Sequence, residues 1–580
     1  MEPSKAPRVS LLWPPGQPPK PGPRRLDTRS IEDLDLHELV LALTGHDQRR
    51  EPFVMDILAE LCTSAEVIRY RQHVLADLLE DATLRQRLGQ VRAALEAMMQ
   101  ERGQRQRASW SVSQIARRVR ELEQYVEATV QLQQCLEDAR PSALAFRLLR
   151  DHVRELTATP EFRALQAELP TLRATIDRVR SVTIGINLTD DLSPDSATVI
   201  DVSAERVEGR APLLERLFGK EGGARRGLTT LHDVDLGNPA NPLYRDLRKL
   251  LEKAIDPVQE AIGRYTSINA YALVELEAEL SLLLNATALA RRLEAAGLPV
   301  CRPEVAGMVE RVTTLQEAYN VGLALRLIAG EARRMHTGDS GETALHATPA
   351  QDGTIGVVTN ALTFDATHAR VWILTGPNRG GKTTYTRAVG QAHVLFQAGL
   401  GVPGSAGRLS PVDAIYTHFA TQESAQVGMG RLDEEAARLA TIFRVATPHG
   451  LILLNEVLAG TSTIEALGLA LDAVRGLRLL GARAIYTTHL HELAARVDEL
   501  NASTAGDAIV GSLVADAEAE VEAGGAVVRS RHRRTFRIIP SPPRNVSYAS
   551  EIAEQHGISF PQLVQLLEGR GLIPRPGDKT

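Results

Sequence analysis

A short stretch beginning at Val371 has the residue types needed to hold a chain of phosphates. Gly376, Gly381, Lys382 and Thr383 form the pattern G-x-x-x-x-G-K-T, between a short apolar run and a helical pattern. Glycine lets consecutive backbone N–H groups point at an anion, lysine adds a point charge, and a threonine hydroxyl is a good ligand for Mg²⁺. The pattern therefore predicts a site for ATP with Mg²⁺ as cofactor. The expected contacts come from Gly376, Pro377, Asn378, Arg379, Gly380, Gly381, Lys382, Thr383 and Thr384.

Two further motifs follow buried-strand patterns. The run Leu451–Leu454 ends in Asn455 and Glu456, and Glu456 stands where a carboxylate can act as the base that polarises an attacking water. Asn455 occupies the position where an aspartate usually supports Mg²⁺, and a neutral amide can hold a Mg²⁺-bound water with less charge. With Thr383 it is the expected metal contact. His489 ends the next strand pattern, where it can sense the γ-phosphate; alternatively it is a structural histidine.

Length and composition allow several domains. The chain has 580 residues, a net charge of −6 and 43 % hydrophobic residues, which is typical of a soluble protein. Its three cysteines have no metal-ligand spacing, so we expect a reducing, cytoplasmic setting. No apolar run approaches the length of a membrane span, so none is expected. Residues 1–27 are rich in proline and arginine and are expected to be a disordered tail.

Periodicity divides the rest of the chain. A helical pattern runs from about Asp27 to Val179, two strands joined by a turn are expected at 181–187 and 197–207, and helices resume from Asn241. Mixed α/β character begins near Thr354. It is followed by an expected mobile loop at 515–525, a strand arm at 526–539 and a helical tail at 547–568.

The chemical motifs, taken in order, resemble the MutS-type mismatch-repair ATPases. The similarity lies in TGPNRGGKTT (375–384), LLNEVLAGTST (453–463) and TTHLHEL (487–493), and extends to 398–419 and 547–558 and more weakly to 68–74. The resemblance implies a multidomain α and α/β fold. Its expected parts are a helical core or lever at 28–342 with a β clamp insertion at about 181–235, a P-loop (ABC-type) α/β ATPase domain at 343–545, and a helical dimerisation segment at 546–580.

The resemblance also implies partners and roles. Family members are homodimers with composite ATP sites whose arms embrace DNA, so we expect double-stranded or branched DNA as a partner. By the same resemblance, Glu456 is the catalytic base and His489 the switch histidine. Gly428–Arg431 matches the loop contributed in trans, and Thr461–Thr463 the turn that crosses the dimer.

Several departures from the family pattern limit this expectation. The family reads mismatches with an N-terminal domain that carries a Phe-x-Glu wedge, but no phenylalanine here is followed two residues later by glutamate, and the lever pattern begins by about residue 40. The expected trans loop lacks its usual serine, and Val357 stands where many members stack an aromatic ring on adenine. We therefore expect an ATPase that switches between open and closed states on a DNA structure, in repair or recombination. The alternatives are true mismatch recognition, a nucleotide-gated scaffold with little hydrolysis, and an ATPase that moves a protein partner.

Two groups of basic residues are candidate DNA contacts. Arginines cluster between Arg102 and Arg120, where a DNA-facing surface and a solvated helix face are both possible. Lys220, Arg225 and Arg226 lie in a glycine-rich stretch beside the expected clamp, and here too contact with phosphates or a solvated loop is possible.

Overall fold

The computed structural model separates into two compact units, which are described in turn. Residues Met1–Ser10 and Asp81–Leu280 form the helical unit, and residues Leu11–Glu80 and Ser281–Thr580 form the P-loop unit. The structure describes residues 9–17, 26–107, 111–192, 194–205, 251, 255–265, 271–337, 356–419, 431–458, 462–503, 505–522, 529–543, 557–570 and 572.

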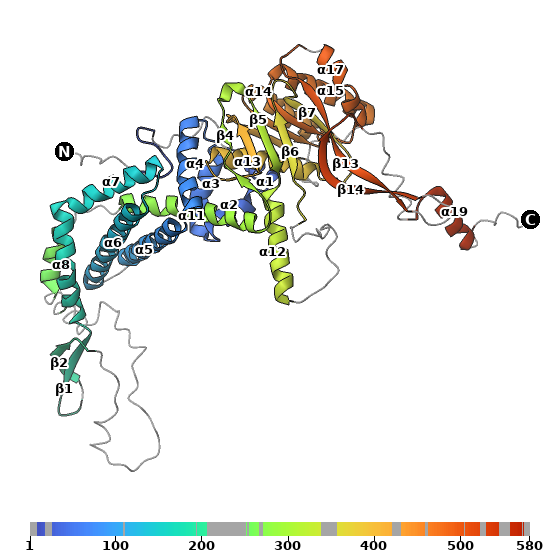
Figure 1. Cartoon of the computed structure of the whole chain (residues 1–580). Helices are drawn as coiled ribbons and strands as arrows, with labels where there is room; N and C mark the ends of the chain where they lie inside the picture. The colour runs from blue at the N-terminus through green and yellow to red at the C-terminus, as the bar shows by residue number, and fades with distance from the viewer. Residues whose placement is uncertain are drawn as a thin grey trace, which may run out of the picture. The chain divides into compact units, whose positions relative to one another are not determined.

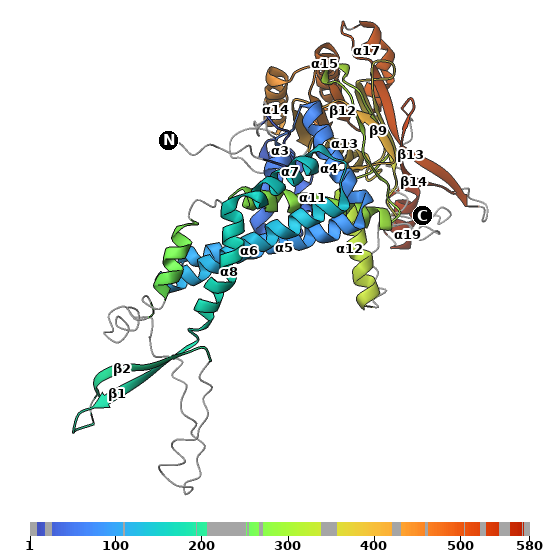
Figure 2. The same cartoon turned by 60° about the vertical axis from the view of Figure 1, so that its left-hand side comes forward.

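Four long helices make up most of the described part of the helical unit. α5 (Ala82–Arg107) and α6 (Ser111–Ala139) lie side by side, followed by α7 (Leu144–Ala158) and α8 (Pro160–Asp177) (Figures 1 and 2). α7 buries Phe146, Leu149 and Val153, which recur at three and four residues and so share one face. Thr159 caps α8, because its side chain accepts a hydrogen bond from the Phe162 N–H. The helical pattern predicted for this region is confirmed.

A two-stranded antiparallel ribbon follows α8. β1 (Ser181–Leu188) pairs with β2 (Pro194–Ser203), with register shifts at two points. Both strands were predicted, with ends displaced by a few residues. Lys220, Arg225 and Arg226 lie outside the described residues. The unit also contains the first part of α11 (Tyr271–Ala295).

Several arginines of the cluster between Arg102 and Arg120 form ion pairs. Arg105 Nε and Arg118 Nη1 lie 3.1 and 2.8 Å from the two oxygens of the Glu121 carboxylate. Arg117 Nη1 lies 3.1 Å from Glu101 Oε2. These acids partly neutralise the arginines, so the ion pairs favour the helix-face interpretation over a DNA-facing surface.

The P-loop unit is built on a six-stranded sheet with the order β10-β11-β12-β7-β13-β14. All neighbouring pairs are parallel except β13–β14, which is antiparallel. The strands span Ile415–Phe419 (β10), Leu451–Asn455 (β11), Arg483–Thr487 (β12), Val371–Thr375 (β7), Val510–Glu522 (β13) and Arg529–Pro540 (β14). A mixed α/β fold was predicted here and is confirmed.

Helices cover both faces of this sheet. Ile452 and Leu454 of β11 join an apolar cluster with α14 (Arg431–Val445), α15 (Thr463–Leu480), α16 (His491–Ala495) and α17 (Val497–Ser503). Leu453, between them in sequence, faces Gly390 of α13 (Lys382–Gln397) instead. Since successive strand residues point to opposite faces, α13 lies on the other side of the sheet from α15.

Two smaller sheets belong to the same unit, and Arg483 of the main sheet is hydrogen-bonded to the segment that follows β9. A four-stranded sheet has the order β4-β9-β5-β6, and β3 pairs with β8. These strands span Val300–Cys301 (β3), Glu304–Val305 (β4), Thr313–Ala318 (β5), Asn360–Phe364 (β6), Val402–Pro403 (β8) and Ala406–Leu409 (β9). Arg483 at the start of β12 is buried, and its guanidinium donates to the carbonyl oxygens of Ser410 and Pro411 at 2.8 and 3.0 Å. Burial lowers the pKa of Arg483 to about 9.

The first helices of the chain belong to the P-loop unit. They are α1 (Thr28–Asp33), α2 (Leu36–Thr44), α3 (Glu51–Ala59) and α4 (Ala65–Glu80), and α12 (Val321–Thr337) joins them later. The carbonyl oxygens of Asp33 and Leu34 accept hydrogen bonds of 2.8 Å from Arg387 Nε and Gln391 Nε2 of α13. On the other side, Thr417 of β10 donates to the Asp33 carboxylate at 2.7 Å. The end of α1 therefore connects the helix that follows the P-loop to the edge strand of the sheet.

Two expectations about disorder are wrong. Residues 9–17 of the expected tail are packed, because Leu11 and Leu12 are buried and the Arg71 guanidinium donates to the Leu12 carbonyl oxygen at 2.9 Å. The same guanidinium lies 4.3 Å from the centre of the Trp13 ring, a cation–π contact. The expected loop at 515–525 is a strand as far as Glu522, because β13 continues beyond the sheet in antiparallel pairing with β14 (Figure 1).

Parts of other predictions fall outside the described residues. They include Gly428–Gly430 of the expected trans loop, Thr461 and all of 544–556. Of the helical tail expected at 547–568, the described part contains α19 (Phe560–Gly569). Within the described ranges, no helix is long and apolar enough to cross a membrane.

Gly390 gives a test of the contact between α1 and α13. A Cβ at this position would fall inside contact distance of a Leu34 methyl group, in a fully buried setting. We expect Gly390→Ala to lower the stability of the P-loop unit by ~1–3 kcal/mol, the usual cost of overpacking. Gly330→Ala in α12 is the matched control, since nothing lies within 4 Å of its Cβ position, and it should be neutral or stabilising. Thermal unfolding checks this; equal midpoints for the two variants would contradict the contact.

Candidate nucleotide-binding site

The glycine-rich loop has the backbone geometry that its sequence predicts. It joins β7 to α13 and contains left-handed φ angles at Gly376 (138°), Arg379 (60°) and Gly381 (92°). A Cβ on Gly376 would lie 2.7 Å from the Ala515 side chain and 3.1 Å from its backbone, so glycine is required there. Because α13 starts directly at Lys382, its N-terminal N–H groups and positive dipole end face the loop. The geometry fits a bound phosphate chain.

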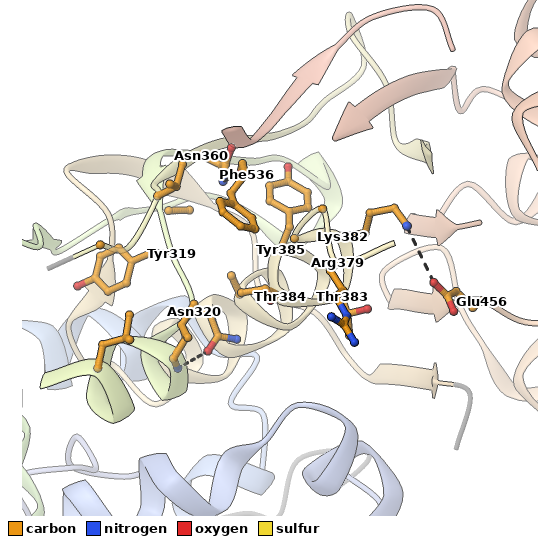
Figure 3. A pocket seen from close by; sticks show the side chains of 18 residues that line it. Tyr319, Asn320, Asn360, Arg379, Lys382, Thr383, Thr384, Tyr385, Glu456 and Phe536 are labelled. Carbon is orange, nitrogen blue, oxygen red and sulfur yellow. Dashed lines mark hydrogen bonds and ion pairs between the residues drawn. The ribbon is translucent and has the colours of Figure 1, made fainter. Parts of the chain in front are cut away.

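Lys382 is held inside this loop by its own backbone. The ammonium group donates to the carbonyl oxygens of Gly376 and Pro377 at 2.9 and 3.0 Å, and Nζ lies 4.0 Å from Glu456 Oε1 (Figure 3). The side chain is only 4 % exposed. Burial lowers the pKa of Lys382 to about 8, and the nearby Glu456 carboxylate only partly opposes this.

The two expected metal contacts are brought together. Thr383 Oγ1 donates to Asn455 Oδ1 at 3.1 Å, which joins the first turn of α13 to the end of β11. Both oxygens are neutral. Mg²⁺ commonly takes one or two protein oxygens and completes its shell with waters and substrate phosphates, so this pair fits the ion if phosphates supply the charge.

Glu456 and His489 form a pair at the ends of neighbouring strands. Glu456 follows β11, has a left-handed φ of 56°, and its N–H donates to the Thr487 carbonyl oxygen at 2.9 Å. Its Oε1 lies 2.8 Å from His489 Nε2. This hydrogen bond lowers the pKa of the Glu456 carboxyl although burial opposes it, so the carboxylate is ionised at neutral pH. A non-glycine residue with positive φ is uncommon, and such strain often marks a functional site.

A cavity of about 480 Å³ adjoins these residues. One part of its wall comes from the loop and α13, and another from β5, α12 and β6 (Figure 3). Of the predicted site residues, Arg379, Gly380, Gly381, Lys382, Thr383, Thr384 and Glu456 line this cavity. Asn455 and His489 do not line the cavity, but they hydrogen-bond to Thr383 and Glu456, which do. The loop residues Gly376, Pro377 and Asn378 do not line it either.

Several lining residues were missed by the sequence analysis. They are Ala318, Tyr319, Asn320, Leu323, Leu327, Gly356, Val358, Asn360, Tyr385, Ala388 and Phe536. Val358 lines the cavity, whereas Val357, singled out from the sequence, does not. Asn360 fixes the strand that carries Phe536, since its Nδ2 donates to the Phe536 carbonyl oxygen at 3.2 Å and its Oδ1 accepts from the Ile538 N–H at 2.6 Å. No local pattern marks these residues, because only the tertiary fold brings them to the loop.

The described part of the expected dimer turn begins a helix. Ser462 is the N-cap of α15, and its side chain accepts a hydrogen bond from the Glu465 N–H. Ile464, in the first turn of α15, is 85 % exposed.

Comparison with known families identifies both parts of the chain. Residues 372–521 match the model of MutS domain V, and residues 63–296 match the model of the MutS2 N-terminal domain. The chain belongs to the MutS family. Thus the resemblance drawn from the P-loop, Glu456 and His489 motifs is confirmed, and the domain V match covers all three.

The relatives include proteins named for DNA mismatch repair. The protein "DNA mismatch repair protein MutS 1" of Halobacterium salinarum is 28 % identical over 456 residues, covering 74 % of this chain and 49 % of the relative. "DNA mismatch repair protein MutS 2" of the same species is 39 % identical over 132 residues, covering 23 % of this chain and 15 % of the relative. MutS of Bartonella quintana is 35 % identical over 135 residues, covering 23 % and 15 %. The match therefore spans about half of the first relative and a smaller share of the others.

The lowered pKa of Lys382 predicts a pH-dependent affinity for ATP. Phosphate attracts the ammonium form, and with a pKa of about 8 this form is lost as the pH rises. ATP affinity should fall at least ~10-fold between about pH 7.5 and 9.5, because proton uptake by Lys382 is linked to binding. Lys382→Ala should bind ATP weakly with a flat profile. Calorimetric titration checks this, and parallel profiles for the two proteins would contradict the role of Lys382.

Proposed function

We propose that this MutS-family protein is a DNA-binding ATPase that hydrolyses ATP to ADP and phosphate. The proposal rests on one observation, that groups suited to bind phosphate, bind Mg²⁺ and activate water lie together at the P-loop. The Lys382 ammonium lies 4.0 Å from the Glu456 carboxylate, and Thr383 hydrogen-bonds to Asn455 at the adjacent strand end. A phosphate-binding cation, two metal-ligand oxygens and an ionised carboxylate thus share one site.

Each residue has a distinct task in the proposed reaction. Lys382 and the N-terminal end of α13 bind the phosphates, and Thr383 and Asn455 hold Mg²⁺. When bound, Mg²⁺ neutralises charge that develops on the phosphate oxygens. The Glu456 carboxylate accepts a hydrogen bond from the attacking water and takes its proton. His489 orients that carboxylate through its 2.8 Å hydrogen bond and lowers its pKa.

ATP binding would require Lys382 to change partners. Its ammonium group now donates to two backbone carbonyls, and a phosphate oxygen is a better acceptor because it is charged. The cavity wall beyond the loop is largely apolar, with Leu323, Leu327 and Val358, which suits the flat faces of a base. Thus phosphates would lie at the loop and the nucleoside between α12 and β6.

DNA is the proposed macromolecular partner. Support comes from the relatives named as DNA mismatch repair proteins and from the match of the helical unit to the MutS2 N-terminal domain. We propose that residues 28–342 act as the lever, with a clamp at about 181–235, and that the substrate is double-stranded or branched DNA in repair or recombination. ATP binding and hydrolysis at residues 343–545 would shift the arms between closed and open states.

A homodimer with composite ATP sites completes the proposal. Ile464, in the first turn of α15 and directly after the residues 461–463 expected to cross the dimer, is 85 % exposed, and an exposed apolar side chain at this place suits a subunit contact. We further propose that 546–580 is a dimerisation segment, since Phe560 and Leu566 of α19 are 79 % and 53 % exposed.

A nucleotide-gated scaffold is the second candidate. Asn455 favours it, because its amide oxygen next to Thr383 brings no charge to the metal contact. In that case ATP would bind and change the conformation while turnover stayed near the uncatalysed rate. Hydrolysis measurements separate the two candidates.

Glu456→Gln tests the assignment of the base. Glutamine keeps the size of the side chain and an acceptor for His489 but cannot take a proton. Steady-state hydrolysis should fall ~10²–10⁴-fold, the usual contribution of a general base, with ATP affinity retained. The control is Glu499→Gln on the exposed face of α17, which should hydrolyse ATP at the parental rate. Parental turnover in Glu456→Gln would remove Glu456 as base; no turnover in the parent would favour the scaffold.

Binding should depend on DNA structure and not on mismatches. None of the ten phenylalanines in this chain starts a Phe-x-Glu wedge, so discrimination must come from backbone shape and from the cost of deforming the duplex. In a competition panel, four-way DNA should bind more tightly than homoduplex, with mismatched and matched duplexes within about twofold of each other. A clear preference for the mismatched duplex at physiological salt would overturn this and favour mismatch recognition.

A further inference from the structure

Asn320 lines the cavity at the end away from Glu456 and has a structural role of its own. It precedes α12, and its Oδ1 accepts a hydrogen bond of 2.7 Å from the Leu323 N–H (Figure 3). Its backbone carbonyl accepts from the Ala324 N–H as well. Asn320 is therefore the N-cap of α12, which fixes the side chain and orients its amide.

The other half of this amide is unused within the protein. Since the Leu323 N–H requires an acceptor, the oxygen is identified and Nδ2 is the remaining atom. Nδ2 forms no hydrogen bond with any described residue. The residue is only 3 % exposed, yet its Nδ2 remains accessible to solvent. A buried amide at a cavity wall, with an N–H₂ group that has no partner in the protein, can donate a hydrogen bond to a bound ligand.

The neighbouring polar side chains described here are hydrogen-bonded within the protein or shielded from the cavity. Both amide atoms of Asn360 bond to the backbone of β14, and the Tyr385 hydroxyl donates to the Ala361 carbonyl oxygen at 3.0 Å. The Tyr319 hydroxyl is shielded from solvent and so cannot meet a ligand in the cavity. Around them the wall is apolar, so a donor from Asn320 would be strong and directional.

We propose that Asn320 is a specificity-determining residue that donates a hydrogen bond to the nucleoside half of the bound nucleotide. The inference rests on the proposed nucleotide site and deepens it. The loop residues Arg379–Thr383 take the phosphates, so the base and ribose occupy the part of the cavity that Asn320 lines. Ring nitrogens of the base and ribose hydroxyls are the acceptors available there.

Asn320→Ser separates ligand binding from helix capping. Serine and asparagine are about equally good N-caps, so the thermal unfolding midpoint should stay close to that of the parent. The variant lacks the amide N–H₂ group, and ATP affinity should fall about 3- to 10-fold, the usual value of one neutral hydrogen bond. Asn320→Asp keeps the cap and replaces the donor with a charged acceptor, so its loss should be larger.

Inorganic tripolyphosphate is the second probe. It carries the phosphates without a nucleoside, so Asn320→Ser should bind it as the parent does, whereas Lys382→Ala should lose affinity for both probes. Repeating the titration with 2′-deoxy-ATP locates the acceptor. If Asn320→Ser then binds as tightly as the parent, the acceptor is the ribose 2′-hydroxyl. If Asn320→Ser still binds more weakly than the parent, the acceptor lies elsewhere on the nucleoside.

Two results would overturn the inference and leave the proposed nucleotide site standing, and a third would overturn both. Parental affinity of Asn320→Ser for ATP removes the contact while the nucleotide site stands. An equal loss for tripolyphosphate assigns Asn320 to the phosphates. If the parent binds neither probe, the nucleotide site itself is wrong and the role of Asn320 falls with it.

Discussion

The charge of Lys382 is the constraint on which the rest of the site depends. The Lys382 side chain is 4 % exposed, so its ammonium group must be satisfied by nearby oxygen atoms. Two carbonyls of its own loop and the Glu456 carboxylate provide them. The loop can present those carbonyls only because Gly376 and Gly381 adopt left-handed backbone angles. Burial still lowers the pKa of Lys382, which leaves the cation under-stabilised and receptive to an anion.

The parallel sheet brings the other reacting groups to this cation. β11 and β12 lie next to each other, and β12 pairs with β7, so Glu456 and His489 emerge at the strand ends where the loop begins. The α13 helix that carries Lys382 is in turn fixed by hydrogen bonds to Asp33 and Leu34, near the start of the chain. The first helices are thus part of the scaffold of the site, and a change in their position would be transmitted to α13 through direct contacts.

The sequence predicted the parts of the site that depend on short-range chemistry. The P-loop, Glu456 and His489 each follow a buried strand, and adjacent parallel strands place such residues at one edge. Asn320 and Phe536 have no local pattern that marks them, because they come from the N-cap of α12 and from β14, far from the loop in sequence. Alanine and glutamate at the end of β13 are poor strand formers and predict a loop, yet pairing with β14 overrides that propensity. Leu11 and Leu12 stand in a proline-rich stretch that does not indicate burial, and their packing in the P-loop unit determines their structure.

A structure of the protein with Mg²⁺ and a non-hydrolysable ATP analogue would show directly whether Lys382 binds the phosphates of ATP. In this complex we expect Lys382 Nζ to leave the Gly376 and Pro377 carbonyl oxygens for the terminal phosphates, with Thr383 at the metal and Glu456 facing the γ-phosphate. The nucleoside should lie between α12 and β6. An analogue bound elsewhere, or bound with Lys382 still on its two carbonyls, would contradict it.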